Sequence, residues 1–271
     1  PRIQDRVYRK VDEKTMRIEK LAEIIEKKSP LCIQEPWDNS GFQIKFEASP
    51  VTRVLTAMEI TNQVIDEAVN LRVEAIVTHH PMFFKPIKEI CDNTVTGNYI
   101  VRLVQNRINV YASHTSFDKC DGGNNDYLAR LLHLCDIRVA GEDGFCRIGT
   151  VDGECRVSEY IEQICRWLNI DRRSVSFAGD LNSEVKTIGL CSGAGAEFAS
   201  SLRRLGCDLF ITGDVKYHDA QEAKESGLNI LDIGHYGSEK IFTENMADYL
   251  RNNTDLDIIE SEADLDPFIL L

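Results

Sequence analysis

Val-Glu-Ala-Ile-Val-Thr-His-His-Pro, residues 73–81, is the stretch that decides how this chain folds. Ala75, Ile76 and Val77 form an apolar run that is typical of a strand buried on both faces. Pro81 lacks a backbone N–H and favours an extended conformation for the residue before it, so the strand should end at the two histidines. Open α/β sheets bind ligands at the carboxyl ends of their strands. The pair is therefore a candidate ligand site, although taken alone it fits a loop without any partner equally well.

The residues on either side of this stretch predict a βαβ unit. A strand is expected over 51–58, a helix over 62–71 and the histidine-bearing strand over 73–78, and this connection makes the two strands parallel neighbours. A helix over 94–107 and a strand over 108–112 continue the same alternation. Polar side chains that follow these strands should therefore meet at one edge of the sheet.

The rest of the chain again alternates strands with helices. An amphipathic helix is predicted at 17–28, and the glycines and acids of 140–144 indicate a boundary between the two halves. Beyond that boundary we expect strands at 145–151, 174–177, 185–191, 207–212 and 229–233, helices at 157–169, 197–205, 219–226 and 240–252, and a short strand in the tail from 255 to 271. The pattern is that of an α/β protein.

Composition excludes several classes of protein. A length of 271 residues suits one large or two modest domains. The formal net charge of −13 disfavours binding to nucleic acid, and no stretch reaches the roughly 18 apolar residues of a membrane span. The nine cysteines are scattered and form no Cys-x-x-Cys pair, which favours reduced thiols and a cytoplasmic location. The first residues lack the apolar region of a secretory signal.

Histidine and a carboxylate recur together after two further predicted strands. His114 precedes Asp118 by four residues, and His235 precedes Glu239 by four residues. In both halves the preceding segments follow the same order, a strand, a helix and a second strand that ends in histidine. This internal echo is too short to establish duplication, but two similar α/β lobes with facing strand ends would explain it.

Together the strand ends supply imidazoles and carboxylates, which are the usual ligands of Zn, Fe, Mn or Co. The candidate residues are His79, His80, His114, Asp118, His235 and Glu239. If Glu239 lies in the first turn of the helix predicted from residue 240, its charge also suits the helix dipole. A catalytic zinc needs only three protein ligands, so this larger set favours two ions. Two ions about 3.5–4 Å apart activate a bridging water for hydrolysis.

Several other motifs are ambiguous. Residues 35–44 lack a helical period, and Asp38 and Asn39 beside Trp37 fit either a site or a turn capped by its own side chains. The glycines at 122–123 and 193–195 could admit phosphate to a helix N-terminus, but their spacing favours close packing. His218 suits a capping or core role at least as well as substrate contact, and His133 is best interpreted as structural.

Five segments in order resemble the Nif-three-like proteins, many of which carry the name GTP cyclohydrolase 1 type 2 homologue. The segments are Trp37-Asp-Asn-Ser-Gly-Phe-Gln, Thr78-His-His-Pro-Met-Phe-Phe, His114-Thr-Ser-Phe-Asp, Gly213-Asp-Val-Lys-Tyr-His-Asp and Gly234-His-Tyr-Gly-Ser-Glu. The resemblance begins near Met16 and covers nearly all of the chain. This ordered set of motifs is highly specific.

The resemblance implies a fold of two similar three-layer α/β lobes with a metal site in the cleft between them. Residues 1–15 would be an N-terminal extension, 16–139 plus 234–271 the first lobe with most metal ligands, and 140–233 the second lobe. Members of this family assemble as toroidal hexamers, trimers of dimers, with two divalent ions per subunit. We therefore expect a homo-hexamer.

The resemblance also assigns roles to residues. The family's metal ligands match His79, His80, Asp118, His235 and Glu239, with Asp118 and Glu239 as the bridging carboxylates. His114 matches a position that is not usually a ligand, so we expect it to transfer protons or contact substrate. His114 and Glu239 are the expected catalytic residues. The chain lacks the extra domain that longer members insert, and it departs from the usual pattern at Ser40, Phe42 and Lys45, which puts the substrate in doubt.

These expectations favour a metal-dependent hydrolase in which an activated water attacks an electrophilic carbon or phosphorus of a nucleotide-like small molecule. For ring opening of GTP the target would be C8 of guanine. The alternative is a non-catalytic metal-binding hexamer with a regulatory role or a protein partner. Binding to DNA is weaker as a hypothesis because the chain is acidic, and no membrane association is expected.

Overall fold

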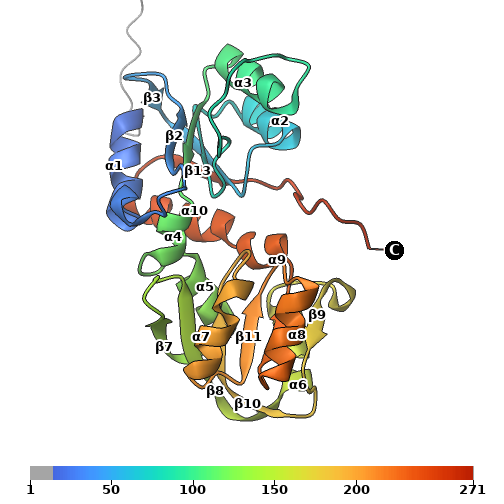
Figure 1. The fold of residues 1–271 in the computed structure, drawn as a ribbon. Helices are drawn as coiled ribbons and strands as arrows, with labels where there is room; N and C mark the ends of the chain where they lie inside the picture. The colour runs from blue at the N-terminus through green and yellow to red at the C-terminus, as the bar shows by residue number, and fades with distance from the viewer. Residues whose placement is uncertain (1–14, 271) are drawn as a thin grey trace, which may run out of the picture.

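The computed structural model describes residues 15–270 and divides them into two lobes (Figure 1). The predicted N-terminal extension therefore lies almost wholly outside the described residues. Each lobe is a sheet covered on both faces by helices, which confirms the predicted α/β class and its two three-layer lobes. Helices α4 (Thr115–Lys119), α9 (His235–Glu239) and α10 (Phe242–Asn253) lie where the lobes meet.

The first lobe contains a five-stranded sheet in the order β13-β4-β5-β6-β2. Its strands are β13 (Asp257–Glu260), β4 (Arg53–Ala57), β5 (Ala75–Thr78), β6 (Asn109–Ala112) and β2 (Gly41–Ile44). The first four are parallel, which the βαβ pattern predicts for β4 and β5 but not for β13, and β2 is antiparallel to β6. A two-stranded ribbon of β1 (Met16–Arg17) and β3 (Pro50–Val51) lies beside it.

Both faces of this sheet are buried because side chains alternate along its strands. Ala75 and Val77 face α1 (Ile18–Lys28) and α10, whereas Ile76 faces α2 (Asn62–Leu71) and α3 (Val95–Gln105). Threonine hydroxyls cap the N-termini of α2 and α3: Thr61 accepts from the Val64 N–H and Thr94 from the Gly97 N–H. The apolar run that opened the sequence is thus a central strand.

The second lobe contains a six-stranded sheet in the order β7-β8-β10-β11-β12-β9. Its strands are β7 (Cys135–Ala140), β8 (Cys146–Arg156), β10 (Glu184–Leu190), β11 (Leu209–Thr212), β12 (Asn229–Asp232) and β9 (Ser176–Ala178). The central strands β10, β11 and β12 are parallel. Helices α5 (Asn124–Leu131) and α6 (Val157–Trp167) cover one face, and α7 (Ala199–Arg204) and α8 (Tyr217–Glu225) cover the other. Short 3-10 turns at Leu31–Ile33, Arg172–Ser174 and Ala196–Phe198 complete the chain.

The structure corrects some predicted elements. Strand β7 was not predicted, and the expected division between residues 139 and 140 falls inside it. Strand β2 occupies part of the segment that was predicted only as a turn. The helix predicted at 240–252 corresponds to α10, and the short helix α9 before it was not predicted. No helix among residues 15–270 is long and apolar enough to cross a membrane.

Candidate metal centre

His79 and His80 follow β5 directly, as the sequence predicts. The backbone N–H groups of both histidines donate to the carbonyl of Met58 at the end of the neighbouring strand β4. The Thr78 hydroxyl donates to the His80 carbonyl at 2.8 Å, which closes the turn. His79 is fully buried, whereas His80 is partly exposed. The corner therefore presents two imidazoles at the carboxyl edge of the first sheet.

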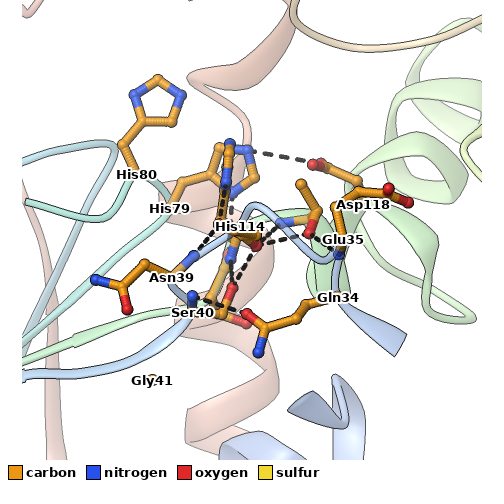
Figure 2. Close-up of polar contacts among 12 residues, drawn as sticks. Gln34, Glu35, Asn39, Ser40, Gly41, His79, His80, His114 and Asp118 are labelled. Atoms are coloured by element: carbon orange, nitrogen blue, oxygen red, sulfur yellow. Dashed lines mark hydrogen bonds and ion pairs between the residues drawn. The ribbon is translucent and has the colours of Figure 1, made fainter. Parts of the chain in front are cut away.

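His114 and Asp118 come from the next strand end. His114 precedes α4, and the Asp118 N–H donates to the His114 carbonyl at 3.1 Å, so this one-turn helix places the carboxylate beside the histidines. Figure 2 shows the Asp118 carboxylate directed toward the ring of His79, and Asp118 Oδ1 lies 3.5 Å from His79 Nε2. Asp118 Oδ1 is buried and has no hydrogen-bond partner among the described residues.

His235 and Glu239 come from the second lobe, at the end of β12. They are the first and last residues of α9, so their spacing of four places them on one face, with His235 Nε2 2.9 Å from Glu239 Oε2. Glu239 therefore ends a short helix. It does not lie in the first turn of the following helix, and the predicted support from a helix dipole does not apply.

The two lobes bring these side chains into one cluster. Glu239 Oε2 lies 2.9 Å from His80 Nε2, and Glu239 Oε1 lies 3.6 Å from His79 Nε2. The residues form three overlapping groups whose ligand atoms lie within 4.8 Å of one another: His79, His80 and His114; His80, His235 and Glu239; and His79, Asp118 and Glu239. Each group has the donor types and spacing that could hold a divalent ion, and the unpartnered oxygen of Asp118 fits such an ion.

The charges of the cluster are strongly coupled. Burial would lower the pKa of His79, but the carboxylates of Asp118 and Glu239 raise it to about 9. The hydrogen bond to Glu239 likewise raises the pKa of His235 to about 9. Burial raises the pKa of Asp118, whereas the neighbouring histidines outweigh burial at Glu239 and lower its pKa. Cationic groups thus compensate the buried carboxylates, which is a role that metal ions also fill.

In three of the histidines, Nδ1 contacts a group outside the cluster. Nδ1 of His114 lies 2.8 Å from Asp38, Nδ1 of His235 lies 2.8 Å from Asp214, and Nδ1 of His79 lies 3.0 Å from the Ser113 carbonyl. Such contacts orient an imidazole and leave Nε2 free toward the cluster. Asp38 and Asp214 both lie in the quoted motifs, but the motifs alone assign neither of them this role.

Asp38 also caps its own turn, as the alternative interpretation proposed. Its carboxylate accepts hydrogen bonds from the Asn39 N–H at 2.7 Å and the Ser40 hydroxyl at 2.8 Å. The same carboxylate accepts from the N–H and hydroxyl of Thr115. Burial alone would raise the pKa of Asp38, but the hydrogen bond and charge of His114, together with the hydrogen bonds from Thr115 and Ser40, outweigh burial and lower it. One side chain therefore fixes both the turn and His114.

The remaining candidates lie outside the cluster. His218 is exposed at the start of α8, and His133 packs on Trp167 with ring centroids 4.6 Å apart. Gly193 has φ +66°, and a Cβ added there would overlap Glu239 Oε1, so this glycine turn packs against the centre. A cavity of about 540 Å³ opens beside the cluster and is lined by residues of both lobes.

Comparisons with known proteins agree with this architecture. The model of the family described as Duf34/NIF3 (NGG1p interacting factor 3) matches residues 16–267. A Clostridium perfringens protein named GTP cyclohydrolase 1 type 2 homolog is 35% identical over 261 residues, covering 93% of this chain and 99% of its own length. A Helicobacter pylori protein named GTP cyclohydrolase 1 type 2 is 33% identical over 245 residues, covering 90% and 96%.

Solved structures show the same fold. A Staphylococcus aureus protein is 28% identical with a TM-score of 0.88, covering 94% of this chain and 99% of its own. A Bacillus cereus protein related to NIF3 superposes with a TM-score of 0.90 at 22% identity, covering 95% and 100%.

Proposed function

The chain belongs to the Duf34/NIF3 family, and from this membership we propose that it is a metal-dependent hydrolase with two divalent ions per subunit. His79, His80, Asp118, His235 and Glu239 would hold the ions. The observation that carries the proposal is Glu239, whose two carboxylate oxygens face different histidines and which belongs to two of the three candidate groups. A carboxylate so placed suits a bridge between two ions.

When bound, the ions would lower the pKa of water toward neutrality and polarise the substrate. The donor set suits Zn, Fe, Mn or Co. His114 supports the proposal from the protein side, because Asp38 holds its Nδ1 and fixes the orientation of the ring beside the cluster, which suits a proton-transfer residue. The names of the relatives suggest a nucleotide-like substrate.

The test combines metal analysis with turnover. Protein purified without chelator or added metal is analysed for its metal content and assayed on GTP and on a panel of phosphoesters. Glu239→Gln should lower metal content and reduce turnover at least about 100-fold. Asp66→Asn, at an exposed site on α2, is the control and should change neither quantity. Turnover that is unchanged in Glu239→Gln would contradict the proposal.

A second candidate function is a non-catalytic metal-binding protein with a protein partner. The family description itself names an interacting factor, which favours this alternative. Absence of turnover across the panel, together with partner binding that survives Glu239→Gln, would select it over the hydrolase.

We also propose a homo-hexamer and a cytoplasmic location. All nine cysteines are free, which suits a reducing compartment. Analytical ultracentrifugation of the metal-loaded protein should give the mass of six chains. A monomeric mass at micromolar concentration would contradict the hexamer.

A further inference from the structure

The cavity beside the cluster has aromatic walls from both lobes. Trp37 and Phe84 of the first lobe flank His114 edge-on, with ring centroids 5.9 and 5.7 Å from it, and are 60% and 53% exposed. Phe145 and Phe198 of the second lobe pack on each other at 5.9 Å. All four rings line the cavity, whose volume of about 540 Å³ suits a small organic ligand. Rings of this kind offer stacking surfaces to a planar heterocycle.

Among residues 15–270, the protein's own side chains do not form a phosphate site in the cavity. Glu35, Asp143 and Glu197 line it in addition to Asp118 and Glu239, and no Lys or Arg is found among its described lining residues. The nearby ammonium of Lys119 is paired with Glu35 and lies 4.6 Å from the centre of the Phe145 ring. Phosphate sites in proteins are normally built from Arg, Lys or free backbone N–H groups.

Most N–H groups of the glycine turn in the cavity wall are already bonded within the protein. The Ser192 N–H donates to Asn125 at 2.7 Å, the Gly193 N–H to Ser238 at 2.9 Å and the Gly195 N–H to Thr212 at 3.0 Å. Because these three donors are already bonded within the protein, they are not free to cradle a phosphate group.

One polar group in the wall does lack a partner. The Ser192 side chain lines the cavity and is only 7% exposed, yet its Oγ has no hydrogen-bond partner among residues 15–270. A buried hydroxyl without a partner is costly, and a ring nitrogen or carbonyl oxygen of a ligand would satisfy it. The Ser192 N–H donates to Asn125, which fixes the point at which the side chain leaves the backbone.

From these observations we infer that the cavity binds a planar nitrogen heterocycle without a polyphosphate chain, a nucleobase or nucleoside, stacked on the aromatic walls with its edge hydrogen-bonded to Ser192. The inference deepens the proposed function, on which it rests, because the heterocycle would then lie beside the metal cluster. The proposed ligand therefore differs from GTP, which appears in the relatives' names, because it lacks a triphosphate. Ser192 is assigned the role of a specificity residue.

The test uses Trp37 as a fluorescent reporter. The chain has two tryptophans, and Trp167→Phe removes the other one, which packs in the second lobe. This variant is titrated, with and without bound metal, with guanosine, adenosine, cytidine, uridine, GTP and pyrophosphate. At least one nucleoside should bind, guanosine should bind about tenfold or more tightly than GTP, and pyrophosphate should not displace the bound nucleoside. GTP binding as tight as guanosine, or no binding by any nucleoside, overturns the inference.

Two further variants test its parts. Ser192→Ala should weaken nucleoside binding about tenfold, whereas Ser200→Ala, exposed on α7, should not change it. Asp143→Asn combined with Glu197→Gln should reduce the ratio of the dissociation constants of GTP and guanosine at least threefold. An unchanged ratio in the double variant, or an unchanged affinity for the nucleoside in Ser192→Ala, counts against the inference. Failure to take up metal would overturn the proposed function alone, because the titration without metal still reports on the cavity.

Discussion

At the scale of single residues, Asp38 holds together two segments that are far apart in the sequence. Its carboxylate accepts from the backbone or side chains of Asn39, Ser40, His114 and Thr115. Removal of a buried acceptor leaves several donors without partners, and hydrogen bonds to a charged group are the strong ones. The turn that carries Trp37 and the orientation of His114 thus depend on one side chain.

Replacement of Asp38 should therefore destabilise the protein. We expect Asp38→Ala to lower the free energy of unfolding by about 2–3 kcal/mol at pH 7, measured by urea denaturation of metal-free protein. Since the folded pKa of Asp38 is lowered, this contribution is present at neutral pH and should be lost as the pH falls below about 4. Asp92→Ala, exposed before α3, is the control. A loss at Asp38 no larger than at Asp92 would refute this expectation.

The cysteines should react in an order set by burial. Burial raises the pKa of Cys120 and of Cys207 to about 12, whereas Cys32 and Cys135 are exposed. Only the thiolate is nucleophilic, so iodoacetamide at pH 8 should modify the exposed pair at least about 100-fold faster. Mass spectrometry of timed samples measures the rates, and urea-unfolded protein, in which all nine should react, is the control. Modification of Cys207 as fast as Cys32 in folded protein would contradict the assignment.

The sequence best predicts the residues nearest the cluster. A strand that ends in His79 and His80 is visible locally, because an apolar run and a proline bound it. The outer partners are harder to predict, because Asp38 and His114 are 76 positions apart and Asp214 and His235 are 21 apart. Nothing in the composition of a turn indicates which distant imidazole it will contact.

At the scale of elements, the glycine turn after β10 is tightly packed against the centre. Gly193→Ala should place a Cβ against Glu239 Oε1 at a backbone conformation that favours glycine. We expect this variant to lose bound metal and at least about 1 kcal/mol of stability. Gly153→Ala has a similar φ of +78° with nothing within 4 Å, so it should lose stability but keep metal. Equal metal contents in the two variants would argue against the predicted contact.

Two strands that the sequence does not predict, β7 and β2, lie at edges of the two large sheets. Strand β7 pairs only with β8, and most of its residues are exposed or partly exposed; β2 likewise pairs only with β6. An edge strand buries little and so shows no clear alternation of apolar and polar residues. The buried central strands, by contrast, were all predicted within a few residues.

At the scale of the whole molecule, a buried arginine ties the lobes together. Arg147 of β8 is fully buried, is paired with Asp126, and donates to the carbonyls of Gly144 at 2.9 Å and Lys119 at 3.2 Å. Lys119 belongs to α4, which follows the first sheet. The guanidinium therefore links the second sheet to the segment that carries Asp118.

Replacement of this arginine should cost about 3–5 kcal/mol of unfolding free energy, because Arg147→Met leaves the Asp126 carboxylate and several carbonyls without their partner. Urea denaturation measures the change. Arg138→Met, exposed on β7, should stay within about 0.5 kcal/mol of the parent protein. A loss of unfolding free energy below about 1 kcal/mol in Arg147→Met would show that the contacts of this arginine are not needed to hold the lobes together.

Removal of metal should destabilise the whole molecule, because the candidate ligands come from both lobes. With free metal at 100 times its dissociation constant, each ion should add about 2.7 kcal/mol to the free energy of unfolding. Melting temperatures before and after chelation, and after metal is restored, measure the effect. Chelation should lower the melting temperature of Glu239→Gln less than that of the parent protein. Identical shifts in both proteins would exclude Glu239 as a ligand.

Helix α9 extends from a strand of one sheet, and the helix after it packs on the other sheet, so the candidate ligands His235 and Glu239 lie where the chain crosses between the lobes (Figure 1). Thermodynamic linkage is reciprocal. If ions favour one mutual orientation of the lobes, then any neighbour or ligand that favours the same orientation must raise ion affinity by an equal factor, and one that favours another orientation must promote ion release.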